Sequence, residues 1–231
     1  MLPDGAAHTG LLLDESRSRE AAGMPQHTGL LLDWGGVMTT NLFHAFGAFC
    51  ATEGLAPDLL RDAFRHDEGT RDALIAFEEG RMDDDLFAGH LARALGLPPE
   101  RAEGLIDRMM AGASVDPDMV AMVRAARAAG IRTGLVSNSW GVLRYPADLV
   151  AELFDATVIS GREGFRKPDE RMYTLGAERI GVAPQQCVFV DDLGFNLTPA
   201  AALGMATVLH ADAATTIRRL EVLLGVPLAG A

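Results

Sequence analysis

The sequence predicts an α/β fold with a three-layer core built on a parallel β-sheet, and with a small helical bundle inserted into that core. Two observations lead to this prediction. From residue 29 onward, short continuous apolar segments alternate with longer amphipathic segments, which is typical of parallel strands covered by helices on both faces. Residues 41–113 break this alternation and show helical periodicity only.

The expected strands are short, apolar and in several cases bounded by Gly, Asp or Ser. They cover residues 29–32, 133–136, 157–159, 187–190 and 206–209. The expected helices of the core lie between and after these strands. They cover residues 117–129, 169–180, 197–203 and 213–224.

Residues 41–113 are predicted to form the helical bundle, with breaks at Pro57, Gly80 and the pair Pro98-Pro99. The core would then consist of residues 27–40 and 114–231. An insertion after the first strand lies over the carboxyl ends of the strands, where ligands bind in open α/β sheets. We therefore expect the bundle to act as a cap over a ligand site.

Residues 1–26 are predicted to be a flexible N-terminal tail outside the folded body. Their segment 8–14, His-Thr-Gly-Leu-Leu-Leu-Asp, recurs as residues 27–33. Only the second copy is followed by glycines that allow a tight turn after a strand, Gly35 and Gly36. We therefore place the first strand in the second copy.

Composition and charge limit the possible partners. A hydrophobic content of 48% and a charged content of 23% are ordinary for a soluble globular protein. The net charge of −12 argues against a nucleic-acid or membrane partner. No apolar run approaches the roughly 18 residues of a transmembrane helix. Cys50 and Cys187 lie far apart in apolar contexts, and we interpret them as reduced core residues of a cytoplasmic protein.

Chemically reactive side chains follow four of the predicted strands or lie near their ends. Asp33 comes directly after the first strand, and Ser137-Asn138 ends the second. Lys167 lies in a loop before Pro168, which is expected to start the next helix. Asp191-Asp192 ends another buried strand. Separately each could be a turn or capping residue, but together they place a nucleophile, a hydroxyl, a cation and a carboxylate pair at one edge of the sheet.

Lys167 is the single lysine of the chain, which otherwise uses nineteen arginines as its cations. A lysine is a compact point charge on a thin stem, whereas arginine is a wide planar fork. A narrow space between two anionic oxygens would accept the former and refuse the latter. This pattern indicates that Lys167 occupies such a space.

The order Asp33, Ser137, Lys167 and Asp191-Asp192, with a helical insertion after the first Asp, resembles the haloacid dehalogenase superfamily. The resemblance covers about residues 27–225 and implies a Rossmann-like core with a helical cap. It also implies hydrolytic chemistry on a small-molecule phosphorylated substrate.

Two segments show a narrower resemblance. Residues 137–140, Ser-Asn-Ser-Trp, and residues 191–200, with Leu203-Gly204-Met205 beyond them, are similar to the N-terminal phosphatase domain of soluble epoxide hydrolases. This likeness implies a phosphatase that forms an aspartyl phosphate on Asp33, which is covalent catalysis by a carboxylate.

The resemblance further implies a Mg²⁺ site of hard oxygen ligands. The ligands would be the Asp33 carboxylate, the Gly35 backbone carbonyl and Asp192, with Asp191 beside them. Carboxylates crowded in this way repel one another unless cations are present.

The remaining site residues would contact the substrate or support the acidic cluster. By the same resemblance Ser137, Asn138, Gly36 and Lys167 would bind the substrate, and Ser137 and Lys167 would also take part in catalysis. Asn196 would orient the acidic cluster.

One position departs from the family pattern. Phosphatases of this superfamily commonly carry a second Asp two residues after the nucleophile, as an acid and base, and here that position is Gly35. Three alternatives follow: a phosphatase that works without this group, a weakly active or non-catalytic phosphate-binding protein, or a 2-haloacid dehalogenase. Dehalogenases need no acidic pair, so Asp191-Asp192 disfavours the last.

Overall fold

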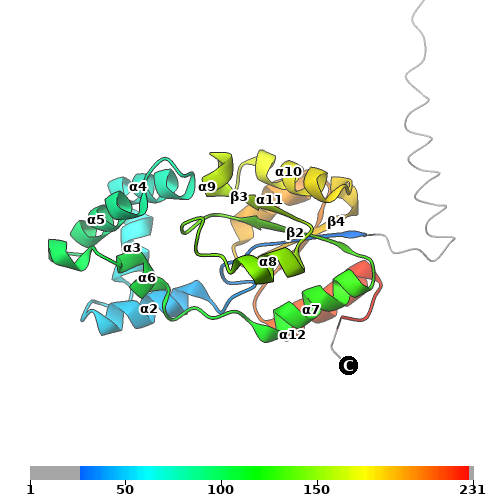
Figure 1. The fold of residues 1–231 in the computed structure, drawn as a ribbon, viewed down its shortest axis with the longest axis horizontal. Coiled ribbons are helices and arrows are strands. Elements are labelled where there is room, and N and C mark those ends of the chain that lie inside the picture. Colours follow the sequence, from blue (N-terminus) through cyan, green and yellow to red (C-terminus); the bar gives the residue numbers. More distant parts are fainter. Residues whose placement is uncertain (1–26, 229–231) are drawn as a thin grey trace, which may run out of the picture.

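The structure, a computed structural model, describes residues 27–228 as a parallel sheet between two layers of helices, with a further group of helices at one end (Figure 1). The α/β fold with inserted helices is confirmed. The predicted flexible tail, residues 1–26, falls outside the described residues. Within residues 27–228, no helix combines the length and apolar character needed to cross a membrane.

The sheet has five parallel strands in the order β3-β2-β1-β4-β5. All five expected strands are present. Their bounds are β1 Gly29–Leu32, β2 Arg132–Ser137, β3 Ala156–Ile159, β4 Cys187–Asp191 and β5 Ala206–Leu209. The chain therefore pairs β1 with β2 on one side and with β4 on the other, so β1 lies at the centre of the sheet.

Alternation along β1 fills the core on both faces of the sheet. Leu30 and Leu32 point into the cluster formed with α7 (Pro117–Ala128), α8 (Ala147–Leu153) and α12 (Ala213–Leu224). Leu31 points into the opposite cluster, which contains side chains of α10 (Glu170–Ile180) and α11 (Gly194–Ala202). In Figure 1 the layer with α10 lies above the sheet and the layer with α7 and α12 lies below it. An all-apolar strand fits this position because both of its faces are buried.

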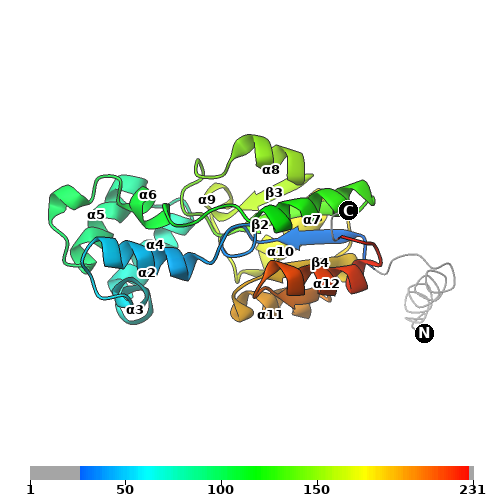
Figure 2. The same cartoon turned by 90° about the horizontal axis from the view of Figure 1, so that it is seen from below.

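Five helices between β1 and β2 pack around a hydrophobic cluster of their own, and we call α2–α6 the helical insert (Figure 2). Their bounds are α2 Leu42–Thr52, α3 Leu59–His66, α4 Glu68–Glu78, α5 Asp84–Ala94 and α6 Leu105–Met110, with a 3₁₀ turn, η1, at Pro99–Arg101. Side chains of Asn41 and Asp83 cap α2 and α5 by accepting backbone N–H bonds.

The helical insert joins the sheet through two short segments that run antiparallel to each other. Thr39 and Val115 form an isolated antiparallel bridge. The backbone N–H of Thr40 donates to the Ser114 carbonyl at 2.8 Å, and the N–H of Asp116 donates to the Met38 carbonyl at 2.9 Å. Both connections therefore leave the sheet at the carboxyl end of β1.

Some predicted helix limits were wrong. The helix after Lys167 begins at Glu170 and not at Pro168; Asp169 precedes it and caps it through the backbone N–H of Arg171. Helix α11 begins at Gly194 and not at residue 197. Its first turn contains two weak helix formers, Gly194 and Asn196, and the sequence pattern therefore did not indicate the earlier start. The short elements α8, α9 (Ser160–Glu163) and η2 (Pro184–Gln186) were not predicted.

Candidate active site

Asp33 lies at the carboxyl end of β1, where the strand order reverses. Its backbone N–H donates to the Val190 carbonyl of β4 at 3.0 Å, which extends the strand pairing up to this residue. Because β1 lies between β2 and β4, Asp33 stands between Ser137, the last residue of β2, and Asp191, the last residue of β4. Ligands bind at such a switch point in open α/β sheets.

The Lys167 ammonium bridges two of these carboxylates. Its Nζ lies 2.9 Å from Asp33 Oδ1 and 2.7 Å from Asp191 Oδ2. The lysine is completely buried, and its Nζ also lies 5.6 Å from the centre of the Phe189 ring. The narrow space between two anionic oxygens that the sequence predicted is therefore present.

The Asp191 carboxylate is surrounded by donors from the protein. Asn196 Nδ2 lies 3.0 Å from its Oδ1 and 3.1 Å from its Oδ2, and the backbone N–H of Leu193 donates to Oδ1 at 2.8 Å. With Lys167 on Oδ2, both oxygens have partners. Asp191 is thus held rigidly in the position from which it faces Lys167.

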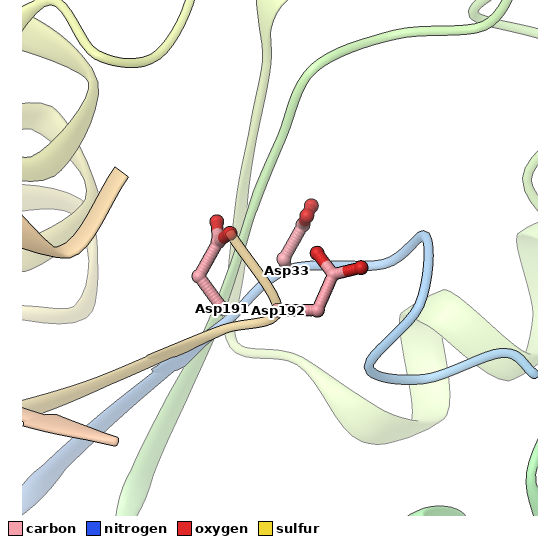
Figure 3. Close-up of side chains that lie close together, drawn as sticks. All are labelled: Asp33, Asp191 and Asp192. Atoms are coloured by element: carbon pink, nitrogen blue, oxygen red, sulfur yellow. The ribbon is translucent and has the colours of Figure 1, made fainter. Parts of the chain in front are cut away.

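Asp33, Asp191 and Asp192 form an acidic cluster, each with a carboxylate oxygen within 4.8 Å of the others (Figure 3). Gly36 lies against this cluster: a Cβ on Gly36 would lie 2.3 Å from Asp192 Oδ2, and its φ of +76° also favours glycine. Three carboxylates against one ammonium leave an excess of two negative charges. Such a set of hard oxygens fits a divalent cation.

Burial and mutual repulsion alter the acidity of the cluster. Burial, only partly offset by Lys167, raises the pKa of Asp33 to about 6. Burial, together with Asp33 and Asp191, raises the pKa of Asp192 to about 7. Burial alone would lower the pKa of Lys167, but the two carboxylates outweigh it and raise that pKa above its ordinary value. Lys167 is therefore charged at neutral pH.

Three further hydrogen bonds fix the predicted substrate-contacting residues Ser137 and Asn138. The Asn138 side chain donates to the Lys167 carbonyl at 3.1 Å and accepts from the Lys167 N–H at 2.8 Å. Tyr145 Oη donates to Ser137 Oγ at 3.0 Å. Ser137 Oγ in turn donates to the Asn138 carbonyl over a long distance of 3.4 Å. Because Ser137 accepts from Tyr145, its own proton remains a donor that could turn from this long bond to another acceptor. Sequence reasoning missed Tyr145, whose position in an irregular loop gave no signal.

A second ion pair near Lys167 was also missed. Glu78, the last residue of α4, pairs with Arg166 of the core, and both side chains are largely buried. Burial raises the pKa of Glu78 to about 7, although Arg166 opposes this shift. Arg166 is the neighbour of Lys167 in the sequence, but nothing in the sequence indicates its partner 88 positions away.

The structure therefore brings together the carboxylates of Asp33, Asp191 and Asp192, the ammonium of Lys167 and the amide of Asn196. Ser137 and Asn138 border the same place from β2. At Gly35 there is no side chain, and Leu42 fills the space: a Cβ on Gly35 would lie 2.7 Å from Leu42 Cδ1. The space that an Asp side chain would need at position 35 is therefore occupied by Leu42 of the helical insert.

A model of the haloacid dehalogenase-like hydrolase family matches residues 27–204. The chain belongs to this family. Among curated proteins, this hydrolase is 37% identical over 116 residues to acyl-CoA dehydrogenase family member 10 of Mus musculus, which covers 48% of this chain and 11% of that protein. It is 30% identical over 152 residues to bifunctional epoxide hydrolase 2 of Rattus norvegicus, which covers 62% of this chain and 27% of that protein. The chain thus spans only a minor part of either relative.

Other similarities extend over most of both chains. The hydrolase is 26% identical over 199 residues to hexitol phosphatase A of Escherichia coli, covering 84% of this chain and 88% of that protein. A solved HAD family enzyme from Bacteroides thetaiotaomicron, in complex with magnesium, matches 80% of this chain and 93% of its own with a TM-score of 0.56 and 19% identity. The structural likeness supports the same fold.

Proposed function

We propose that this hydrolase is a Mg²⁺-dependent phosphatase that acts on a small phosphorylated metabolite through an aspartyl phosphate on Asp33. One observation carries the proposal: Lys167 holds Asp33 and Asp191 at 2.9 and 2.7 Å, within a cluster of three carboxylates. The similarity to a hexitol phosphatase over most of both chains supports phosphoryl chemistry.

In this reaction an Asp33 carboxylate oxygen attacks phosphorus while the bond from phosphorus to the alcohol oxygen breaks. The alcohol leaves with the electron pair and takes up a proton. Water then hydrolyses the aspartyl phosphate, which restores Asp33 and releases inorganic phosphate. The net reaction converts one phosphate ester and one water molecule into one alcohol and one inorganic phosphate.

Each neighbouring residue has a role that its contacts suit. Lys167 keeps Asp33 ionised and lowers the repulsion between its carboxylate and the incoming phosphate. Ser137 accepts from Tyr145 and would donate its proton to a phosphoryl oxygen in place of its long bond to the Asn138 carbonyl. Asn138 fixes the Lys167 backbone. Gly36 leaves room for the Asp192 carboxylate, which a Cβ at this position would meet at 2.3 Å.

The acidic cluster would hold the metal through Asp33, Asp192 and the Gly35 carbonyl, with Asp191 in support and oriented by Asn196. When bound, Mg²⁺ supplies positive charge to the phosphoryl oxygens. The excess of two negative charges in the cluster matches the charge of this ion. In this proposal residues 41–113 serve as the cap over the site.

The first test is hydrolysis of p-nitrophenyl phosphate with and without Mg²⁺, for the wild type and Asp33→Asn. Metal-dependent turnover that disappears in the variant would support the proposal. Asp148→Asn, an exposed position at the start of α8, is the matched control and should behave as the wild type. Turnover that persists in Asp33→Asn would contradict a role of Asp33 as nucleophile.

A second candidate is a weakly active or non-catalytic phosphate-binding protein, which the absence of a carboxyl side chain at Gly35 favours. Saturable binding of inorganic phosphate by calorimetry, without turnover of any ester, would identify it. A 2-haloacid dehalogenase is the third candidate. It would release chloride from 2-chloropropionate without added metal, and a chloride measurement would detect this activity.

A further inference from the structure

A cavity of about 210 Å³ opens beside Asp33, between the sheet and the helical insert. Trp34 and Gly35, which follow Asp33, line it together with Ser137 and Asn138. A phosphoryl group at Asp33 would therefore place the remainder of its ester in this cavity. The cavity walls consequently decide which alcohol the site accepts.

The walls are apolar and aromatic. Leu42, Met110 and Val115 line the cavity, as do Trp140 and Tyr145 from the loop after β2. The Tyr145 ring contacts Trp34 edge to face at 5.8 Å. Trp140 packs among four phenylalanine rings of the helical insert, at centroid distances of 5.6 to 6.5 Å. These aromatic walls are thus fixed in place before any ligand enters.

The charged side chain that lines this cavity, among the described residues, is already neutralised. Arg144 donates to Asp84 at 2.6 Å and to Asp107 at 2.7 Å, both from the helical insert. No second cation in the described lining could accept another anionic group of a substrate. A substrate with a carboxylate or a second phosphate would leave that charge unpaired in the cavity.

Three polar side chains of the lining, Tyr145, Thr39 and Asn138, are engaged as well. The Tyr145 hydroxyl donates to Ser137, and the Thr39 hydroxyl donates to the Thr40 carbonyl and accepts from the Gly36 N–H. The Asn138 amide binds the Lys167 backbone. A polyol would therefore bury several hydroxyls without partners, which is unfavourable.

The size of the cavity sets a limit. An apolar cavity of about 150 Å³ holds one benzene molecule, and pockets for drug-sized ligands exceed about 300 Å³. At about 210 Å³ the cavity has room for one ring with a short linker. A longer chain would extend beyond this volume.

We propose that the substrates are monophosphate esters of compact apolar or aromatic alcohols that carry no second charged group, with the alcohol part held in this cavity. This inference rests on the proposed phosphatase function. Specificity comes from the walls formed by Trp34, Leu42, Met110, Trp140 and Tyr145, and the phosphoryl group is handled at Asp33 as described above.

The test compares kcat/KM with Mg²⁺ for benzyl phosphate, glycerol 1-phosphate and phosphoglycolate, all of which have alkyl leaving groups. Benzyl phosphate should exceed the other two by about 10- to 100-fold, the effect of burying one ring. Acetyl phosphate and p-nitrophenyl phosphate serve as activated references. Calorimetry with Mg²⁺ provides an independent reading, in which benzylphosphonate should bind about 10- to 100-fold more tightly than methylphosphonate.

Variants locate the effect in the cavity. Met110→Gln nearly conserves volume but adds polarity to the wall, so it should reduce the benzyl-to-glycerol ratio by about 10-fold. Leu86→Gln, at an exposed position of the helical insert, is the matched control and should leave the ratio unchanged. An equal or reversed ranking of the esters, or a ratio unaffected by Met110→Gln, would overturn this inference but not the proposed phosphatase function. Failure to hydrolyse any ester or acetyl phosphate would overturn the proposed function, and the inference with it.

Discussion

Glu78 of the helical insert and Arg166 of the core form a buried ion pair one residue away from Lys167. The Ser160 hydroxyl donates to the Glu78 backbone carbonyl at 2.5 Å, and Ser160 Oγ accepts from the Ser139 N–H at 2.8 Å. Glu78 of the helical insert therefore contacts the loop that carries Lys167 directly, and it reaches the loop that carries Asn138 through Ser160. Docking of the insert and positioning of the site are physically linked at this point.

Removal of Arg166 should destabilise the protein far more than removal of the pair. Arg166→Met leaves the Glu78 carboxylate buried and unpaired, and we expect a loss of about 3–5 kcal/mol in the free energy of unfolding. In the double variant with Glu78→Gln no unpaired charge is buried, so a substantial part of the lost unfolding free energy should return. Urea unfolding at pH 8, above the Glu78 pKa of about 7 in the wild type, measures the stability of both variants.

The matched control for this ion pair lies in the next residues of the chain. Glu79 and Arg81 are 2.6 Å apart, but the Arg81 side chain is 59% exposed. Arg81→Met should therefore change the unfolding free energy by no more than about 1 kcal/mol. Additive effects of the two substitutions at Glu78 and Arg166 would show that these residues do not act as a pair.

Binding of Mg²⁺ should strengthen as pH rises from 5.5 to 8. In the metal-free protein the pKa of Asp33 is about 6 and that of Asp192 about 7, and both must lose their protons to bind the ion. Over this range deprotonation of the two groups raises the apparent affinity by roughly 100-fold. Titration calorimetry in two buffers of different ionisation enthalpy should reveal proton release near pH 6.

Asp192→Asn should remove much of this pH dependence, because one of the two titrating groups is gone. Asp212→Asn, at an exposed helix cap, should leave it intact. An affinity for Mg²⁺ that is flat between pH 5.5 and 8 in the wild type would show that these carboxylates do not hold the ion.

The positions of Asp33, Ser137 and Asp191 could be predicted because each ends an apolar run that reads as a buried strand. Parallel strands bring their carboxyl ends to one edge, so the order along the chain was sufficient to gather these residues. The helical insert was equally visible, since its periodicity differs from that of the strands. These features depend on local sequence alone.

The pairs Glu78–Arg166 and Tyr145–Ser137 could not be predicted in this way. Each depends on how the helical insert or an irregular loop folds back over the sheet, and that geometry is determined by packing between segments distant in sequence. The closeness of Leu42 to Gly35 is of the same kind. The sequence indicated Lys167 and the acidic cluster, whereas the residues that support and enclose them emerged only from the fold.

Lys167→Arg should fail although it conserves the charge. Lys167 is fully buried, with its Nζ between two carboxylates and above the Phe189 ring. A guanidinium is wider and planar, so it would displace Asp33 or Asp191. We expect kcat with Mg²⁺ to fall at least about 100-fold, as for Lys167→Met.

Arg166→Lys tests the neighbouring position and should have a milder effect on kcat, because its charge partner Glu78 is a single carboxylate. Activity close to that of the wild type in Lys167→Arg would show that a compact cation is not needed.

Restoring a carboxyl group at position 35 should require space that Leu42 now fills. A Cβ at Gly35 would lie 2.7 Å from Leu42 Cδ1, so Gly35→Asp alone forces that side chain aside, whereas Gly35→Asp with Leu42→Ala does not. A general acid contributes about 10²–10⁴-fold where the leaving group is poor. We therefore expect the double variant to raise kcat/KM for benzyl phosphate by at least about 10-fold over Leu42→Ala alone.

The kcat/KM for p-nitrophenyl phosphate, whose leaving group needs no proton, should change little between the same two variants. The two esters place rings of similar size in the cavity, so a change in cavity shape affects both alike. An equal gain on both esters would mean that the new carboxylate acts on binding and not on the leaving group.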